Sequence, residues 1–117
     1  MKKLFKRKPV AIYAYTASKN QEDLQNQIYR IENELLKSNI KNIKIYAESG
    51  NAVSFSKASR PMLDKLIHDC ESGLIKDVYI KSVDRFGRDV LKTLRTLRIL
   101  RENGIRVFLM NEKICVK

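Results

Sequence analysis

The feature that most constrains the fold of this chain is a regular alternation of short apolar runs with longer stretches of helical periodicity. The apolar runs, at residues 10–16, 44–47, 77–83 and 105–110, have the length and composition of strands. Parallel neighbouring strands require a crossover, which is usually a helix. The order therefore predicts an α/β fold with a mainly parallel sheet of four or five strands and helices on its faces. At 117 residues, one domain over residues 10–117 is expected.

Two of the expected helices have clear sequence boundaries. The first covers residues 20–38, and its buried stripe is predicted to be Leu24, Ile28, Ile31 and Leu35. The second follows a Gly-, Asn- and Ser-rich loop at residues 48–59. It is predicted to begin at Ser59-Arg60-Pro61, with Ser59 as N-cap, and to end at Gly73.

The third expected helix covers residues 88–103 and ends before Gly104. Its hydrophobic residues predict one broad buried side, and basic residues form a stripe on the opposite side. Ile99 falls inside the basic stripe, where we expect an isolated exposed side chain. The predicted buried side consists of Val90, Leu91, Leu94, Leu97 and Leu100, and the basic stripe of Arg88, Lys92 and Arg95.

The balance of charge favours a polyanionic partner. The chain has 24 Lys and Arg against 13 Asp and Glu, a formal net charge of +11. Cations that neutralise DNA phosphates release condensed counterions, which makes binding strong and sensitive to salt. The alternative is an ordinary solvated basic surface, and charge alone leaves the two interpretations about level.

Several functional classes are disfavoured by composition. The only cysteines are Cys70 and Cys115, and His68 is the only histidine, so we expect no zinc site and no cofactor. Residues 1–9 are basic and lack the apolar segment of a signal peptide or membrane anchor, so they are predicted to be a flexible arm. The sequence thus predicts a cytoplasmic protein that has no membrane contact.

Ligands of parallel α/β sheets bind at the carboxyl ends of the strands, here just after Thr16, Tyr46 and Val83. The segment Asp84-Arg85-Phe86-Gly87-Arg88-Asp89 places two guanidinium groups beside a helix N-terminus, where planar forks of donors suit phosphate oxygens. Alternatively, Asp84 caps the helix and the arginines are solvated. Arg60 adds a third guanidinium at the rim of the loop. Glu48 either orients an arginine or, as the sequence favours, is a solvated loop carboxylate.

The order of these segments resembles the catalytic domain of serine recombinases, the resolvase/invertase family, from Val10 to about Met110. Tyr13-Ala14-Tyr15-Thr16-Ala17-Ser18, followed by Gln21, is similar to the family's Y-A-R-V-S-T segment. Leu24-Gln25-Asn26-Gln27 resembles its L-x-x-Q, and Arg60-Pro61-Met62-Leu63 its R-P-x-L. The most specific match is Asp84 to Asp89, which resembles D-R-L-G-R-D.

This resemblance implies attack of a serine on a DNA phosphodiester to give a 5′-phosphoserine bond, without ATP or an obligatory metal. By position, the phosphate-binding arginines correspond to Arg60, Arg85 and Arg88. The neighbouring acid corresponds to Asp84, and the glutamine that faces the site to Gln27. The family's separate DNA-binding domain has no counterpart in these residues, so we expect weak affinity for any particular DNA sequence.

Two departures affect the chemistry. Ala17 occupies the position of the nucleophile, and a methyl group cannot attack phosphorus. Tyr15 occupies the position of a neighbouring arginine, and we expect it to pack or stack rather than to attack. Ser18 is one residue further on, where its side chain would point the other way unless a bulge intervenes.

Three functions remain open. The first is a recombinase-like protein incapable of strand exchange, which binds DNA backbone phosphates or a recombinase partner as a homodimer or a mixed assembly. The second is an active recombinase with Ser18 as a displaced nucleophile. The third is an α/β domain that binds a phosphorylated small molecule, although no Gly-rich phosphate loop is present.

Overall fold

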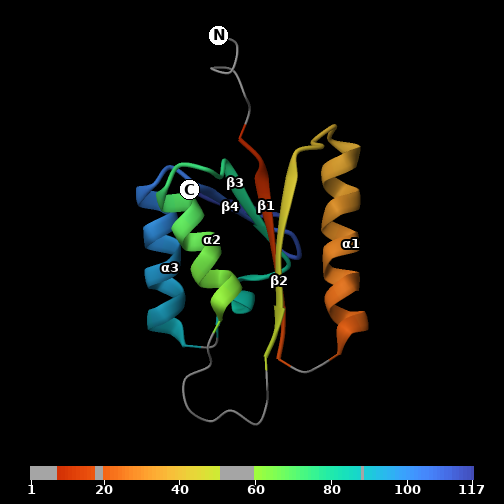
Figure 1. Ribbon diagram of the computed structural model, residues 1–117, viewed down its shortest axis with the longest axis horizontal. Helices are drawn as coiled ribbons and strands as arrows, with labels where there is room; N and C mark the ends of the chain where they lie inside the picture. The colour runs from red at the N-terminus through yellow and green to blue at the C-terminus, as the bar shows by residue number, and fades with distance from the viewer. Residues whose placement is uncertain (1–7, 18–19, 51–59, 88) are drawn as a thin grey trace.

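The computed structural model describes residues 8–17, 20–50, 60–87 and 89–117 (Figure 1). Ser18, Ser59, Arg88 and most of the predicted basic arm lie outside the described residues. The elements in chain order are β1 (Val10–Thr16), α1 (Gln21–Lys37), β2 (Ile43–Ser49), α2 (Pro61–Glu71), β3 (Asp77–Ile80), the 3-10 turn η2 (Val83–Phe86), α3 (Val90–Glu102), β4 (Arg106–Leu109) and β5 (Ile114–Val116).

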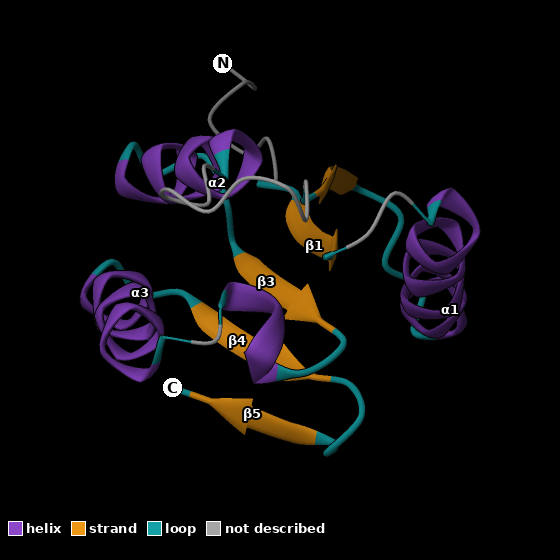
Figure 2. Ribbon diagram, turned by 90° about the horizontal axis from the view of Figure 1, so that it is seen from below, coloured by secondary structure: helices purple, strands orange, loops and turns teal. Residues whose placement is uncertain are grey.

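The strands form one five-stranded sheet in the order β2-β1-β3-β4-β5. β1 pairs in parallel with β2 and β3, β3 pairs in parallel with β4, and only β5 is antiparallel. Figure 2 shows α1 on one face of the sheet and α2 with α3 on the other. The predicted α/β fold with a mainly parallel sheet is therefore confirmed. None of the helices in the described residues is both long and apolar enough to cross a bilayer.

The core lies on both faces of the sheet because helices cover both, and β1, which is paired along both edges, contributes side chains to each face. Its consecutive residues Ile12 and Tyr13 are both fully buried, on opposite faces. Ile12 belongs to the cluster beneath α1, whereas Tyr13 belongs to the larger cluster beneath α2 and α3. Such two-sided burial explains why the β1 sequence reads as a continuous apolar run.

Helix α1 is close to its prediction at both ends. Asn20 caps it by accepting a hydrogen bond from the Asp23 backbone N–H at 3.1 Å, and Ser38 is the C-cap. The predicted buried stripe is wrong at one position, because the fourth buried residue is Gln27 and not Ile28, which is half-buried. Burial of the Gln27 carboxamide leaves neither its oxygen nor its nitrogen unpaired, because both are hydrogen-bonded to the main chain of Tyr15.

Three strand boundaries differ from their predictions. β2 is longer and includes Glu48 and Ser49, because parallel pairing with β1 continues to Thr16. β3 ends at Ile80, and the chain then turns through η2, so Val83 is not part of a strand. β4 is confined to Arg106–Leu109.

The N-terminus of α2 is not capped as predicted. The N-cap residue is Arg60 rather than Ser59, and its side chain makes no capping hydrogen bond. The free backbone N–H groups of Met62 and Leu63 instead donate to the Glu48 carboxylate, at 3.0 and 3.1 Å. At the other end, Gly73 has a φ of +76°, as expected of a glycine that terminates a helix.

The predicted buried side of α3 is wrong in its first two turns. Val90, Leu91 and Leu94 are 69%, 74% and 56% exposed, whereas Thr93, Thr96 and Leu100 are buried. The helix is rotated because the Thr93 hydroxyl donates to the Gly87 carbonyl at 3.1 Å, which holds that side against η2. The alternative in which Asp84 caps this helix is also wrong, since Asp89 accepts from the N–H groups of Leu91 and Lys92. Ile99 is half-buried rather than exposed.

Candidate functional site

The candidate site lies at the carboxyl end of β1, around Tyr15. Two guanidinium groups that are distant in sequence meet there, Arg60 from the start of α2 and Arg85 from η2. Arg85 Nη1 donates to the Tyr15 carbonyl oxygen at 3.1 Å, and the Arg60 guanidinium lies over the Tyr15 ring at 3.5 Å. The structure thus brings together two of the three predicted arginines. The third, Arg88, lies outside the described residues.

Arg60 is held by three contacts. Besides the Tyr15 ring, its Nη1 donates to the Arg85 carbonyl and to the Tyr13 hydroxyl, the latter at 3.4 Å. Stacking of a guanidinium on an aromatic face restricts its rotamers while leaving its outer N–H groups able to donate. The expectation that Tyr15 packs or stacks is confirmed.

The side chain of Arg85 is mostly buried, at 21% exposed. Its Nε is buried and has no hydrogen-bond partner among the described residues. The carboxylate of Asp84 is 3.9 Å away, too long for a hydrogen bond, and accepts instead from the Ser82 hydroxyl. Asp84 itself is 66% exposed. An unpaired guanidinium donor is the group that an added acceptor oxygen would satisfy.

Gln27 anchors the same segment from the α1 side. Its Oε1 accepts from the Tyr15 N–H at 3.3 Å, and its Nε2 donates to the Tyr15 carbonyl at 2.8 Å and to Asp23 at 3.2 Å. The carboxamide therefore binds both polar groups of one residue of β1. In this structure Gln27 therefore fixes the backbone of β1 two residues before position 17.

Glu48 has a role that neither alternative from the sequence described. Its carboxylate accepts from the Tyr13 hydroxyl at 2.7 Å and from the two N–H groups at the start of α2. It thereby ties β1, β2 and α2 together behind the arginines. Burial, followed by the hydrogen bond to Glu48, raises the pKa of Tyr13 well above its ordinary range despite the nearby Arg60. Tyr13 is thus held as a neutral phenol at physiological pH and is a poor nucleophile.

Ala17 is the residue that follows β1 directly. It lies in a bend and is exposed. The preceding residue, Thr16, is buried and accepts the Gly50 N–H at 2.7 Å through its carbonyl oxygen, so the chain is fixed up to position 16. Ser18, the doubtful nucleophile of the sequence analysis, lies outside the described residues.

The site consists of guanidinium, carboxamide and carboxylate groups and has no recognisable set of metal ligands. In the part of the chain that the structure describes, no three His, Cys, Asp or Glu side chains are close enough to hold a metal ion. The contributions of Tyr13 and Glu48 were missed from the sequence. No local pattern signalled them, because Glu48 comes near the Tyr13 hydroxyl through the parallel register that pairs Tyr13 with Tyr46.

Comparison with known proteins identifies the family. The model of the resolvase N-terminal domain matches residues 10–116. Among solved structures, the N-terminal catalytic domain of TP901-1 integrase has a TM-score of 0.76 and 26% identity, over 92% of this chain and 82% of that one. A resolvase family site-specific recombinase from Streptococcus pneumoniae gives a TM-score of 0.72 at 21% identity, over 93% and 76% of the two chains.

A third structure, the C-terminal catalytic domain of ISC1926 TnpA, an IS607-like serine recombinase, also has a TM-score of 0.72 at 21% identity. It is matched over 87% of this chain and 67% of that one. A search of curated protein sequences gave no match. Because the family model covers nearly the whole sequence, this chain belongs to the resolvase N-terminal domain family and is a domain of the site-specific recombinase type.

Proposed function

We propose that this chain binds DNA backbone phosphates through the Arg60 and Arg85 site but cannot cut DNA. The observation that carries this proposal is the combination of two converged guanidinium groups with an alanine at the exposed end of β1. Two guanidinium forks suit phosphate oxygens, whereas the Ala17 methyl group has no lone pair for attack on phosphorus.

The proposed role of the retained arginines is binding rather than transition-state stabilisation. Tyr15 stands where the family has another arginine, so one cation of the family's site is replaced by a ring that holds Arg60. Gln27 and Glu48 fix β1 and α2 without contributing a nucleophile. Arg88 is proposed to complete the phosphate site, and Asp84, the neighbouring acid, is proposed to turn away from Arg85 when a phosphate is bound.

Mixed assembly with an active recombinase is the second part of the proposal. Its support is the apolar face of α3 formed by Val90, Leu91 and Leu94, which nothing in the described chain covers. Contiguous exposed apolar side chains on a helix are typical of association surfaces. A homodimer through the same face is the corresponding expectation in the absence of a partner.

The proposal is tested by incubating the protein with labelled nicked and intact duplexes at low and moderate salt. One aliquot goes to a binding titration and another to a denaturing gel. Binding that weakens steeply with salt and leaves no covalent adduct supports the proposal. A covalent adduct that is abolished by Ser18→Ala would establish a displaced nucleophile. Absence of any DNA binding would favour a small phosphorylated ligand or a protein partner.

A further inference from the structure

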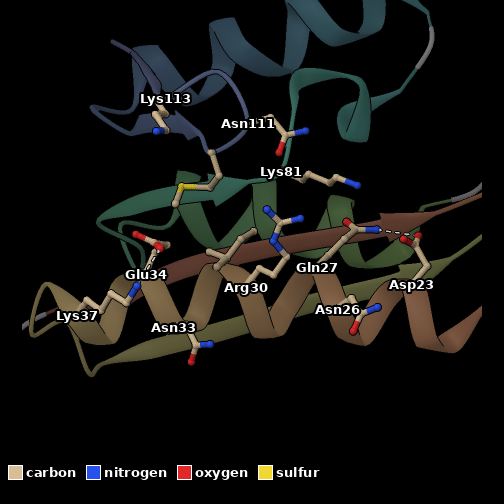
Figure 3. A pocket seen from close by; sticks show the side chains of 12 residues that line it. Asp23, Asn26, Gln27, Arg30, Asn33, Glu34, Lys37, Lys81, Asn111 and Lys113 are labelled. Carbon is tan, nitrogen blue, oxygen red and sulfur yellow. Dashed lines mark hydrogen bonds and ion pairs between the residues drawn. The ribbon is translucent and has the colours of Figure 1, made fainter.

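A polar groove runs along α1 on the sheet face opposite to α2 and α3. Its volume is about 680 Å³, and it lies between α1 and the carboxyl ends of β3 and β4 (Figure 3). It exists because α1 packs on β1 and β2, and this single helix leaves the neighbouring strands of the same face only partly covered (Figure 2). Residues that line it include Asn26, Gln27, Arg30, Lys81, Asn111 and Lys113.

The strand side of the groove is set by residue alternation. Ile80 and Leu109 are paired in register and point to the α2 and α3 face. The residues that follow the two strands, Lys81 and Met110, line the groove on the α1 face, where Met110 packs against the cluster that contains Ile31. Backbone hydrogen bonds of 2.9 Å from Met110 to Ile80 and from Asn111 to Lys81 continue the pairing beyond the strands, which holds the Lys81 and Asn111 main chains side by side.

The helix side is a stripe that borders the buried one and shares Gln27 with it. Asp23, Gln27, Arg30, Glu34 and Lys37 are spaced by four, three, four and three residues, so they lie along one edge of α1. In Figure 3 the Arg30 side chain extends from α1 toward Lys81 and Asn111 on the opposite wall. Ile31 and Met110 supply the apolar floor.

The charges of the groove are unbalanced. Its two carboxylates are engaged within α1, since Asp23 accepts from Gln27 at 3.2 Å and Glu34 pairs with Lys37 at 3.6 Å. Arg30, Lys81 and Lys113 have no ion pair with another described residue. The groove is thus lined by four cations, including Lys37, against the two carboxylates, with carboxamides that both donate and accept hydrogen bonds between them.

We infer that this groove is a second binding site for the phosphodiester backbone of a nucleic acid, separate from the arginine site. Arg30, Lys81 and Lys113 would contact phosphate oxygens, and Asn26 and Asn111 the sugar or base edges. Gln27 connects the two sites, because it lines the groove and binds the Tyr15 backbone. The inference rests on the proposed DNA contact, and it adds a path along which the strand continues past Tyr15.

The test compares two charge-matched double variants of the full chain. Lys81→Gln with Lys113→Gln removes two charges from the groove. Lys41→Gln with Lys76→Gln removes two exposed charges at the amino-terminal edge of the sheet. Fluorescence anisotropy with a short labelled duplex is measured over a range of salt concentrations, and circular dichroism checks folding. Arg30→Gln, on the opposite wall, is the second groove variant.

We expect the groove pair to bind about fivefold more weakly than the control pair. We also expect the slope of log K against log salt to fall in magnitude by about 1 to 2. If the two double variants bind DNA equally well and Arg85→Gln still weakens binding, the groove is not a DNA-binding site and the proposed arginine site is unaffected. No effect of Arg85→Gln counts against the proposed function instead. If poly-glutamate competes as effectively as unlabelled duplex, the inference is also wrong, because the groove then binds anions in general rather than nucleic acid.

Discussion

Replacement of Glu48 by glutamine should destabilise the domain far more than its half-buried position at the end of a strand suggests. One oxygen of this carboxylate accepts from Met62 N–H, and the other accepts from both Leu63 N–H and the Tyr13 hydroxyl. A carboxamide has only one acceptor oxygen, so the best orientation of the introduced side chain still loses one bond and points an NH₂ at a donor. A hydrogen bond to a charged group contributes about 1.5–3 kcal/mol, and a negative charge at a helix N-terminus about 0.3–1 kcal/mol.

The expected loss for Glu48→Gln is therefore about 2–4 kcal/mol in the free energy of unfolding. For a domain of this size, that corresponds to a decrease in Tm of about 10 °C. Urea unfolding followed by circular dichroism gives the first quantity and a thermal melt the second. Glu71→Gln is the matched control, because Glu71 is exposed at the other end of α2, and it should change stability by less than about 0.5 kcal/mol. A loss below about 1 kcal/mol for Glu48→Gln would refute the role assigned to this carboxylate.

Three further predictions concern other parts of the fold. The hydrogen bond from Tyr46, with lysines nearby, lowers the pKa of Asp69 in the folded protein. The stability that ionised Asp69 contributes is therefore complete above its unfolded pKa of about 3.9, and it is lost as the pH falls through the folded pKa. Acid unfolding of Asp69→Asn should consequently be less dependent on pH below about 4, and an unchanged profile would contradict this. Burial raises the pKa of Cys70 to about 12, and Cys115 is half-exposed. A thiol reagent at pH 8 should therefore modify Cys115 rapidly and Cys70 only after denaturation. Rapid modification of both thiols in the folded protein would be inconsistent with the burial of Cys70. A Cβ at Gly50 would overlap the Tyr15 hydroxyl oxygen, so Gly50→Ala should lower the free energy of unfolding by about 1–3 kcal/mol. In a double-mutant cycle, Tyr15→Phe should recover part of this loss, whereas purely additive effects would exclude the clash.

The fold was predictable because its strongest signals are local. The apolar run of β1, the stripe of α1 and the strand-helix alternation each follow from the burial of one element against another. The errors in the helices occur where a hydrogen bond from a side chain to the main chain overrides the hydrophobic pattern. Gln27 takes a core position because the Tyr15 main chain satisfies its carboxamide, and Thr93 turns α3 away from the side that its leucines suggest.

The candidate site was predictable in part. Arg60 and Arg85 were expected near one place because Arg85 follows a strand and Arg60 lies at the rim of a loop that could reach the same strand ends, and both contact Tyr15 in the structure. The role of Glu48 could not be predicted, because it depends on the extension of β2 by two residues and on the missing cap of α2. The stack of Tyr15 on Arg60 depends on the side chains of two elements 45 positions apart, and no local pattern specifies it.

The central claim, that this recombinase-family domain binds the DNA backbone without cutting it, is tested most directly by looking for a covalent complex. The protein is incubated with end-labelled nicked duplex at low salt, bound complex is confirmed on a native gel, and a portion is denatured and resolved under denaturing conditions. Matching samples contain Ser18→Ala, and Arg85→Gln reports on the phosphate site. We predict a salt-sensitive complex that Arg85→Gln weakens and from which denaturation releases all of the DNA unmodified. A labelled band that survives denaturation with the unsubstituted protein and disappears with Ser18→Ala would contradict the account and establish strand cleavage.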